Sequence, residues 1–248
     1  MVKRKSEPQK TSTPPVSSRR ERKYLNGETE LKSKKIVVGN GGLPFDPEEA
    51  VRHVKRADKR MAKLIEQVGG LKLELDEMLT PFEALAESIV YQQLTGKAAA
   101  TIFARVKGLY GGTLPAPKLI VRTPEDKLRS AGLSNAKALA LKDLALKAEQ
   151  GLVPSLKQLE GMSDEEIVET LTAIRGIGRW TVEMLLIFRL GRPDVLPVND
   201  YGVRKGFALT YGRKEELPTP KELFAYGECW RPYRSVASWY LWRALDKK

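Results

Sequence analysis

The sequence predicts an all-α fold, and three features of the chain support this class. Apolar residues recur at helical spacing along most of it, polar capping signals precede these segments, and glycines close them. The alternation typical of strands is confined to residues 71–75, and residues 36–38 form the only other extended candidate. At ordinary helix lengths, the remainder predicts roughly eight to ten helices.

Five segments begin like helices, each with a side-chain oxygen at the N-cap position and an acid three residues later. Four of the five place proline at the first helical position, where its missing N–H costs nothing. Glycines mark the predicted stops at residues 69–70, 111–112, 132 and 151. The predicted N-caps are Asp46, Thr80, Thr123, Ser163 and Thr219.

Apolar residues between these signals fall on one helical face and are the candidate core. The clearest stripe lies within residues 51–68, and a looser one lies within residues 139–146. The members of the first are Val51, Val54, Met61, Leu64, Ile65 and Val68, and those of the second are Leu139, Leu141, Leu144 and Leu146.

Composition excludes several classes of protein. The chain has 248 residues and no run of the ~20 apolar residues that a membrane-spanning helix needs. Its start, Met1 to Lys5, is basic without an apolar run behind it, so we expect a protein that is not secreted. One cysteine, Cys229, and one histidine, His53, exclude a disulfide framework, a cysteine-rich zinc site and a histidine-based triad. We expect both residues to be structural or incidental.

The charge is strongly basic and unevenly distributed. The chain carries 43 Lys and Arg against 31 Asp and Glu, a net charge of +12, which favours a polyanionic partner such as nucleic acid. Residues 1–40 hold eleven basic and four acidic residues, and the remainder therefore carries +5. Few large apolar side chains occur in this segment, so we predict a disordered basic tail. Its basic clusters suit an import signal, a DNA-contacting arm or a plain solvated leader.

Two helices joined by a glycine-rich turn stand out in the second half of the chain. Residues 164–174 and 179–190 are helical in pattern, and between them Gly176 and Gly178 flank Ile177. Such a turn leaves backbone N–H groups at a helix N-terminus, which is a favourable place for a phosphate. The alternative is that these glycines only join two packed helices.

The wider pattern resembles the helix-hairpin-helix (HhH-GPD) DNA glycosylase superfamily, in its 3-methyladenine DNA glycosylase II branch. The hairpin reads IRGIGRWT from residue 174, and a loop then leads to PVND ending at Asp200. Residues 88–99, SIVYQQLTGKAA, are similar to the branch's DNA wedge, and residues 230–242, WRPYRSVASWYLW, to its C-terminal helix. The resemblance spans about residues 45–246. It implies two helical lobes with a cleft between them, in a glycosylase domain over residues 41–248.

Asp200 matches the family's catalytic aspartate. Glycosidic cleavage passes through an oxocarbenium-like state, which a fixed carboxylate stabilises. The start of the predicted helix 201–210 also favours an anion there. The alternative is an ordinary N-cap. Asn199 departs from the acid that many relatives carry; capping of the helix is one role open to it, and the sequence does not decide its role. Of the rival carboxylates nearby, we expect Glu183 at the surface and Asp194 as a loop cap.

Aromatic residues match the family's base pocket. Trp180 stands where bifunctional relatives carry the lysine that forms a Schiff base, so the resemblance implies an enzyme without lyase activity. Trp180 and Trp242 would instead face a cationic alkylated base, with Tyr91 and Met184 as neighbours. Core packing is the alternative for all four. Trp239 and Tyr240 also lie in these segments, and we expect them in the core.

The remaining carried-over roles concern DNA and one ion. Gln93 and Leu94 match the side chains that fill the gap left by a flipped base, with a polar turn as the alternative. Lys97, Gly176 and Gly178 are candidate contacts to the DNA backbone. The family's hairpin binds an alkali cation, Na⁺ or K⁺, through main-chain carbonyls. These carbonyls belong here to Thr172, Ile174 and Ile177.

The resemblance implies a monofunctional glycosylase that flips alkylated bases out of double-stranded DNA, chiefly 3-methyladenine with 7-methylguanine as a further substrate. We expect a monomer that needs no cofactor for chemistry and no membrane. Its location would be the nucleus in a eukaryote and otherwise the cytoplasmic nucleoid. Two alternatives remain: a glycosylase of the same superfamily for oxidised, deaminated or mismatched bases, and a DNA-binding protein without catalysis.

Overall fold

The computed structural model describes residues 42–78, 80–213 and 216–246. These residues form thirteen α-helices and one 3₁₀ turn, and no strand occurs among them. The expected eight to ten helices were too few, because three of the thirteen have only six residues and show no amphipathic stripe. The helices are α2 (Pro47–Ala57), α3 (Lys59–Val68), α4 (Pro81–Tyr91), α5 (Gly96–Gly108), α6 (Pro117–Arg122), α7 (Glu125–Ser130), α8 (Asn135–Glu149), α9 (Leu156–Gly161), α10 (Asp164–Thr172), α11 (Arg179–Phe188), α12 (Tyr201–Thr210), α13 (Pro220–Gly227), η1 (Glu228–Trp230) and α14 (Arg234–Arg243).

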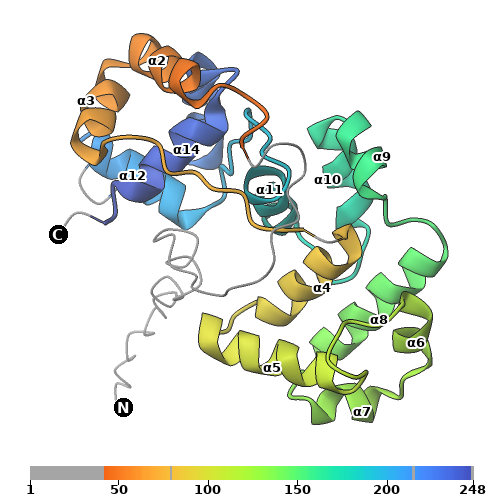
Figure 1. The fold of residues 1–248 in the computed structure, drawn as a ribbon. Coiled ribbons are helices and arrows are strands. Elements are labelled where there is room, and N and C mark those ends of the chain that lie inside the picture. The colour runs from red at the N-terminus through yellow and green to blue at the C-terminus, as the bar shows by residue number, and fades with distance from the viewer. Residues whose placement is uncertain (1–41, 79, 214–215, 247–248) are drawn as a thin grey trace, which may run out of the picture.

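The helices gather into two lobes on either side of α11. One lobe joins the first helices to the last, because α14 packs against α2, α3 and α12, and Figure 1 shows these orange and blue helices side by side. The other lobe contains α4 to α8, and α11 lies between the two lobes beside α10. The predicted extended residues 71–75 are neither helix nor strand and belong to the segment that links the lobes. The predicted tail and the run 36–38 lie outside the described residues.

Most predicted N-caps are confirmed. The side chains of Asp46, Thr80, Ser163 and Thr219 each accept a backbone N–H in the first turn of their helix. Ser163 and Thr219 also complete reciprocal capping boxes with the glutamates three residues on. The prediction for Thr123 was wrong. This residue ends α6, and its hydroxyl donates to the Leu119 carbonyl at 2.7 Å.

The predicted stripe of residues 51–68 is divided between two helices. Asp58 ends α2 and caps α3, so the chain turns between Val54 and Met61, both of which are fully buried. The Asp58 carboxylate also accepts from the Tyr211 hydroxyl and from Trp230 Nε1, at 3.0 Å for the indole. This acid therefore fastens the first helices to the end of the chain.

Two helices are buried over almost their whole length. Every residue of α11 from Thr181 to Phe188 is buried, and so is every residue of α14 from Arg234 to Trp242. A helix that is buried on all sides is held in place by all of its neighbours, which suits it to position a functional group. Within the described residues, no helix is long and apolar enough to cross a membrane.

Candidate functional site

Asp200 is a buried carboxylate at the start of α12, with 4% of its surface exposed. Its Oδ1 accepts from the Val203 N–H at 2.7 Å and so caps the helix. The same oxygen accepts from Trp242 Nε1 at 2.8 Å, and Oδ2 accepts from Trp180 Nε1 at 2.7 Å. The residue is therefore an N-cap that two indoles also bind, and these three donors fix the orientation of the carboxylate.

The two tryptophans reach Asp200 from different helices. Trp180 lies in the first turn of α11 and is half-buried, whereas Trp242 lies near the end of α14 and is buried. A glycine makes this meeting possible, because a Cβ at Gly202 would lie 2.7 Å from Cδ1 of Trp242 and 3.1 Å from Asp200 Oδ1. No local sequence signal marks Gly202, because the requirement for glycine arises from Trp242 of α14, forty residues away.

Of the roles open to Asn199, that of helix cap is excluded, because Asp200 caps α12 and Asn199 is exposed. Asp194 accepts from Nε of Arg234 at 2.7 Å and from the Arg234 backbone N–H at 3.3 Å, at the first residue of α14. It thus joins the loop before Asp200 to the helix that carries Trp242.

The expectation for Glu183 was wrong, since its side chain is buried rather than at the surface. Nε of Arg179 donates to it at 3.2 Å, and the same guanidinium forms two bonds of 2.9 Å with Glu165 on α10. Burial raises the pKa of Glu183 to about 7 and outweighs Arg179, which lowers the pKa; the negative charge of Asp200 adds to the rise. A second titratable carboxyl therefore lies near Asp200.

A small hollow lies between α4, α11 and the segment that links the lobes. Its lining comprises Asp76, Ala84, Ser88, Met184, Leu185, Phe188 and Arg189. Met184, a predicted pocket residue, lines it, and the ring of Phe188 lies 5.6 Å from that of Trp242. Trp180, Met184 and Phe188 are spaced at four residues and so form one stripe of α11, which runs from Asp200 to this hollow.

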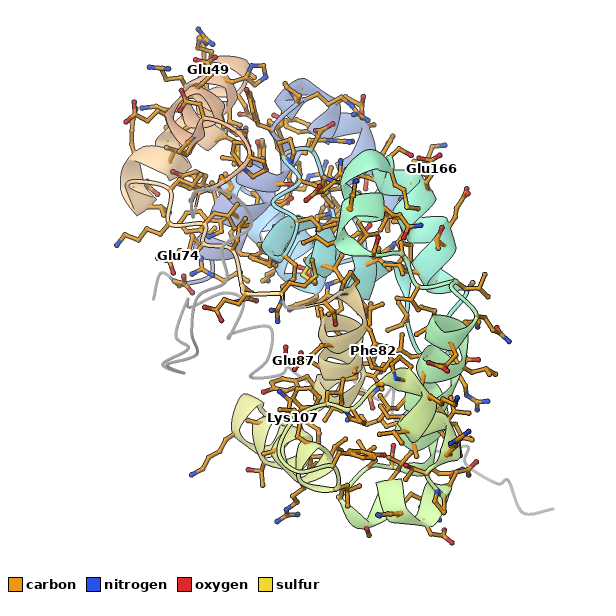
Figure 2. The ribbon with its side chains drawn as sticks, turned by 45° about the vertical axis from the view of Figure 1, so that its right-hand side comes forward. Glu49, Glu74, Phe82, Glu87, Lys107 and Glu166 are labelled. Atoms are coloured by element: carbon orange, nitrogen blue, oxygen red, sulfur yellow. The ribbon has the colours of Figure 1, made fainter. Side chains whose placement is uncertain are left out.

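Two further groups define the surroundings of the hollow. Arg189, one of its lining residues, pairs with Glu87 on α4 at 2.8 Å, and Figure 2 labels Glu87 on this helix. Lys107 of α5 pairs with Glu83, one turn earlier on α4, at 2.9 Å. Tyr91, the other predicted pocket neighbour, does not line the hollow. It is buried, and its ring lies edge-on to Phe103 of α5 at 6.4 Å. Trp239 and Tyr240 are buried, as expected.

The turn between α4 and α5 presents Gln93 to solvent. Among the described residues, Gln93 alone combines a side chain with a positive φ, of 56°. The left-handed conformation is costly for such a residue, so the surrounding turn must enforce it. Leu94 beside it is half-buried against the core, and Lys97 is exposed. The turn therefore displays one polar side chain over a partly buried apolar one.

The two hairpin glycines differ in what they require. Gly176 has φ of 79°, and a Cβ there would lie 3.0 Å from Cβ of Ala140, so the fold itself needs glycine. Gly178 has an ordinary extended backbone, and nothing in the described chain lies within 4 Å of a Cβ built on it. No acceptor among the described residues contacts the N–H groups of Gly176, Gly178 and Arg179. The hairpin thus has open space at Gly178 and free backbone N–H donors at Gly176, Gly178 and Arg179.

The three predicted cation ligands lie at the end of α10 and in the hairpin. Ile174 O accepts from the Ile177 N–H at 3.0 Å and retains a second lone pair. Backbone carbonyls at a helix C-terminus suit a hard cation. A cation already lies at this terminus, because Nζ of Lys147 donates to the Ala173 carbonyl at 2.6 Å. This ammonium group occupies the Ala173 carbonyl, which is not one of the three predicted ligands.

Comparison with known proteins gives consistent matches. The family model described as HhH-GPD superfamily base excision DNA repair protein matches residues 86–232. DNA-3-methyladenine glycosylase 1 of Schizosaccharomyces pombe is 38% identical over 193 residues, which cover 77% of this chain and 84% of the relative.

Two solved structures also match. The 3-methyladenine DNA glycosylase of the same yeast, solved in complex with abasic DNA, has a TM-score of 0.68 and 37% identity, over 79% of this chain and 95% of that one. A DNA-3-methyladenine glycosidase from Bacillus halodurans has a TM-score of 0.73 and 38% identity, over 83% and 92% of the two chains.

Proposed function

The chain belongs to the HhH-GPD superfamily of base excision DNA repair proteins, and from this premise we propose that it is a monofunctional DNA glycosylase for alkylated bases. Its substrate is double-stranded DNA that contains 3-methyladenine, with 7-methylguanine as a further substrate. One observation carries the proposal: the buried carboxylate of Asp200 is held between two indole N–H groups, and one of them, that of Trp180, lies in the first turn of the helix that follows a hairpin with free backbone donors.

The Asp200 carboxylate is suited to stabilise a positive sugar. When the C1′–N bond breaks, its electron pair leaves with the base and positive charge develops on the deoxyribose. Three donors from the described part of the chain occupy most of the lone pairs of Asp200. Oδ2 has Trp180 as its single donor among them and retains room to face the sugar or to orient water. Water then adds to C1′, releases a proton to solvent and leaves an abasic site.

The pocket residues suit a base that is a good leaving group. A purine methylated on a ring nitrogen carries positive charge, which an aromatic face attracts. Trp180 and Phe188 supply such aromatic faces on one stripe of α11, with Met184 between them. Because the cationic base departs easily, the proposed reaction needs no general acid.

Lyase activity is not part of the proposal. Cleavage of the DNA backbone through a Schiff base requires an amine beside the sugar, and the side chain at position 180 is an indole. Within the described residues, the hydrogen-bond donors to the Asp200 carboxylate are Val203, Trp180 and Trp242, and none of them is an amine. Borohydride treatment during the reaction should therefore trap no covalent protein–DNA adduct, and a good yield of adduct would contradict this assignment.

The hairpin and the wedge turn provide the grip on DNA. The free N–H groups at Gly176 and Gly178 suit a phosphate, with Lys97 as a further contact. A structural Na⁺ or K⁺ at the carbonyls of Thr172, Ile174 and Ile177 would supply positive charge between the hairpin and that phosphate. Gln93 would fill the gap left by the flipped base, over Leu94. We propose a monomer that acts on nuclear or nucleoid DNA.

Release of free base from methylated DNA tests the proposal. Wild-type protein should release 3-methyladenine, whereas Asp200→Asn should lose most of this activity, because a neutral amide does not stabilise the cation. Asp126→Asn is the matched control, since the Asp126 side chain is 98% exposed on α7 and should keep full activity. Salt-dependent DNA binding without base release by the wild type would instead favour the non-catalytic alternative. A panel of single-lesion duplexes separates alkylated from oxidised or deaminated substrates.

A further inference from the structure

We propose that Gln92 and α8 form a brace that fixes the wedge turn relative to the hairpin, and that Gln92 is a positioning residue for the inserted Gln93. This deepens the proposed function and rests on it. Gln92 ends α4, and its Nε2 donates to the Gly176 carbonyl in the hairpin at 2.7 Å. The two DNA-contacting elements, 84 residues apart, are thus joined by a direct hydrogen bond.

One end of α8 holds the wedge turn. Nζ of Lys137, in the first turn of α8, donates to the carbonyls of Val90 at 2.9 Å and Gln92 at 2.6 Å. These carbonyls lie at the end of α4, where no intrahelical donor remains for them. An ammonium group so placed fixes the backbone directly before Gln93, the residue held in the left-handed conformation.

The middle and far end of α8 hold the hairpin. Oδ2 of Asp143 accepts from the Arg175 N–H at 2.7 Å and from Nζ of Lys147 at 2.8 Å. Lys147 in turn donates to the Ala173 carbonyl, and Ala140 lies against Gly176. Because α8 is a continuous fifteen-residue helix, its contacts at both ends set the separation of the two elements.

This arrangement has a functional consequence. A plug can replace a flipped base only if it reaches the stack while the backbone of the same DNA is gripped elsewhere. The hairpin supplies that grip, and Gln92 bonds to the hairpin while its neighbour Gln93 points to solvent. The side-chain amide of Gln92 is bonded to the Gly176 carbonyl, so Gln92 acts through Gln93 rather than on DNA.

A double-mutant cycle tests this relation. Gln92→Met keeps the length of the side chain but removes the donor, Gln93→Ala removes the plug, and the two are combined. Single-turnover excision is measured on a paired 3-methyladenine and on the same lesion opposite an abasic site, where opening costs little. Gln67→Met, at an exposed position on α3 outside the brace, is the matched control and should match wild type on both substrates.

If the brace exists, Gln92→Met should slow excision of the paired lesion about tenfold, the equivalent of one hydrogen bond. It should change the excision rate of the unpaired lesion less than about twofold. The double variant should be no slower than Gln93→Ala alone to within about twofold, as expected for residues acting as one unit. Melting temperatures show that each variant is folded. The brace would be overturned if the rate losses of the two single variants multiplied in the double variant. It would also be overturned if Gln92→Met slowed excision equally on both substrates.

A readout that needs no cleavage keeps the two proposals separable. Binding to a duplex with 2-aminopurine beside the target site should raise its fluorescence as the stack opens, and Gln92→Met should reduce this rise. If the wild type released no base, the proposed function would fail while this signal still tested the brace. An unchanged rise in Gln92→Met would overturn the brace even in an active enzyme.

Discussion

The indole of Trp180 donates to Asp200 only two residues after Gly178, the hairpin glycine that faces open space. The proposed phosphate grip and the holder of the carboxylate therefore share the first turn of α11. A displacement of this turn moves both groups together, so seating of the hairpin on DNA and orientation of Asp200 are coupled by covalent structure.

Replacing either indole should impair catalysis more than folding. Trp180→Phe and Trp242→Phe each keep an aromatic ring but remove a donor to the Asp200 carboxylate. A hydrogen bond to a charged group contributes about 1.5–3 kcal/mol, so we expect the single-turnover rate to fall roughly ten- to a hundredfold. Rates on methylated DNA at saturating protein measure this. Trp239→Phe is the control, since Trp239 lies on the same buried helix without contacting Asp200; an equal loss there would point to packing.

The two hairpin glycines should respond differently to substitution. Gly178→Ser places a good N-cap residue where the fold leaves space, so thermal stability should be retained while DNA affinity falls, because the new side chain occupies the approach to the free N–H groups. Gly176→Ala should lower stability by about 1–2 kcal/mol, since its positive φ and its contact with Ala140 disfavour a Cβ. Denaturation and fluorescence anisotropy with duplex DNA measure the two effects. Undiminished affinity in Gly178→Ser would contradict the proposed phosphate site.

Glu183 should make stability depend on pH between about 4.5 and 7. Burial raises its pKa from 4.5 to about 7, so the folded protein binds this proton more tightly than the unfolded chain, and the free energy of unfolding falls as pH rises through this window. Glu183→Gln removes the effect. As pH rises from 4.5 to 7.5, the free energy of unfolding of the variant should increase by up to roughly 3 kcal/mol relative to that of the wild type. Urea denaturation across this range measures it.

The control for this experiment is Glu165→Gln. Glu165 pairs with the same Arg179 but is exposed, and the pKa of Glu165 is lowered rather than raised, chiefly by the hydrogen bond from Arg179. Its replacement should therefore give no such gain with rising pH. Parallel stability curves for Glu183→Gln and wild type would mean that Glu183 ionises in the folded protein as it does in the unfolded chain.

Close packing of α12 on α14 should make Gly206 intolerant of any side chain. A Cβ there would lie 1.9 Å from the Leu241 carbonyl oxygen, which is backbone and cannot move alone. We expect Gly206→Ala to lower stability by about 3 kcal/mol or more. Gly108→Ala, at the end of α5 with no atom of the described residues within 4 Å of the new Cβ, should be neutral or stabilising by up to ~1 kcal/mol. Calorimetry compares them, and similar melting temperatures would show that the helices separate at little cost.

Local chemistry made much of the fold predictable. Capping depends on residues within one turn, so Asp46, Thr80, Ser163 and Thr219 were identified correctly from the sequence. The prediction that Thr123 caps a helix was wrong because α6, a six-residue helix too short to show a pattern, ends at this residue. The prediction that Glu183 lies at the surface was wrong because the lobes that enclose α11 decide its burial. The apolar run around it, residues 184–188, was the available signal of a helix buried on all sides.

The site was predictable only in part. The resemblance located Asp200 and both tryptophans in the sequence, but hydrogen bonds between them join residues 20 and 42 positions apart and require the folded lobes. Apart from its place beside Gln93, no sequence pattern marked Gln92 as a functional residue, because its hydrogen-bond partner Gly176 lies 84 residues later. Periodicity and spacing describe neighbours along the chain, and contacts of this range depend on how helices pack.

The pairing of the first helices with the last one determines when the site can exist during synthesis. Residues 81–149 form α4 to α8 and their mutual contacts, so this lobe can assemble while the ribosome is still translating. Asp200 acquires its second indole only with α14, the last helix described, which also completes the lobe begun by α2 and α3. A nascent or prematurely terminated chain would therefore carry the hairpin without a completed carboxylate site, and would bind DNA before it could cut a glycosidic bond.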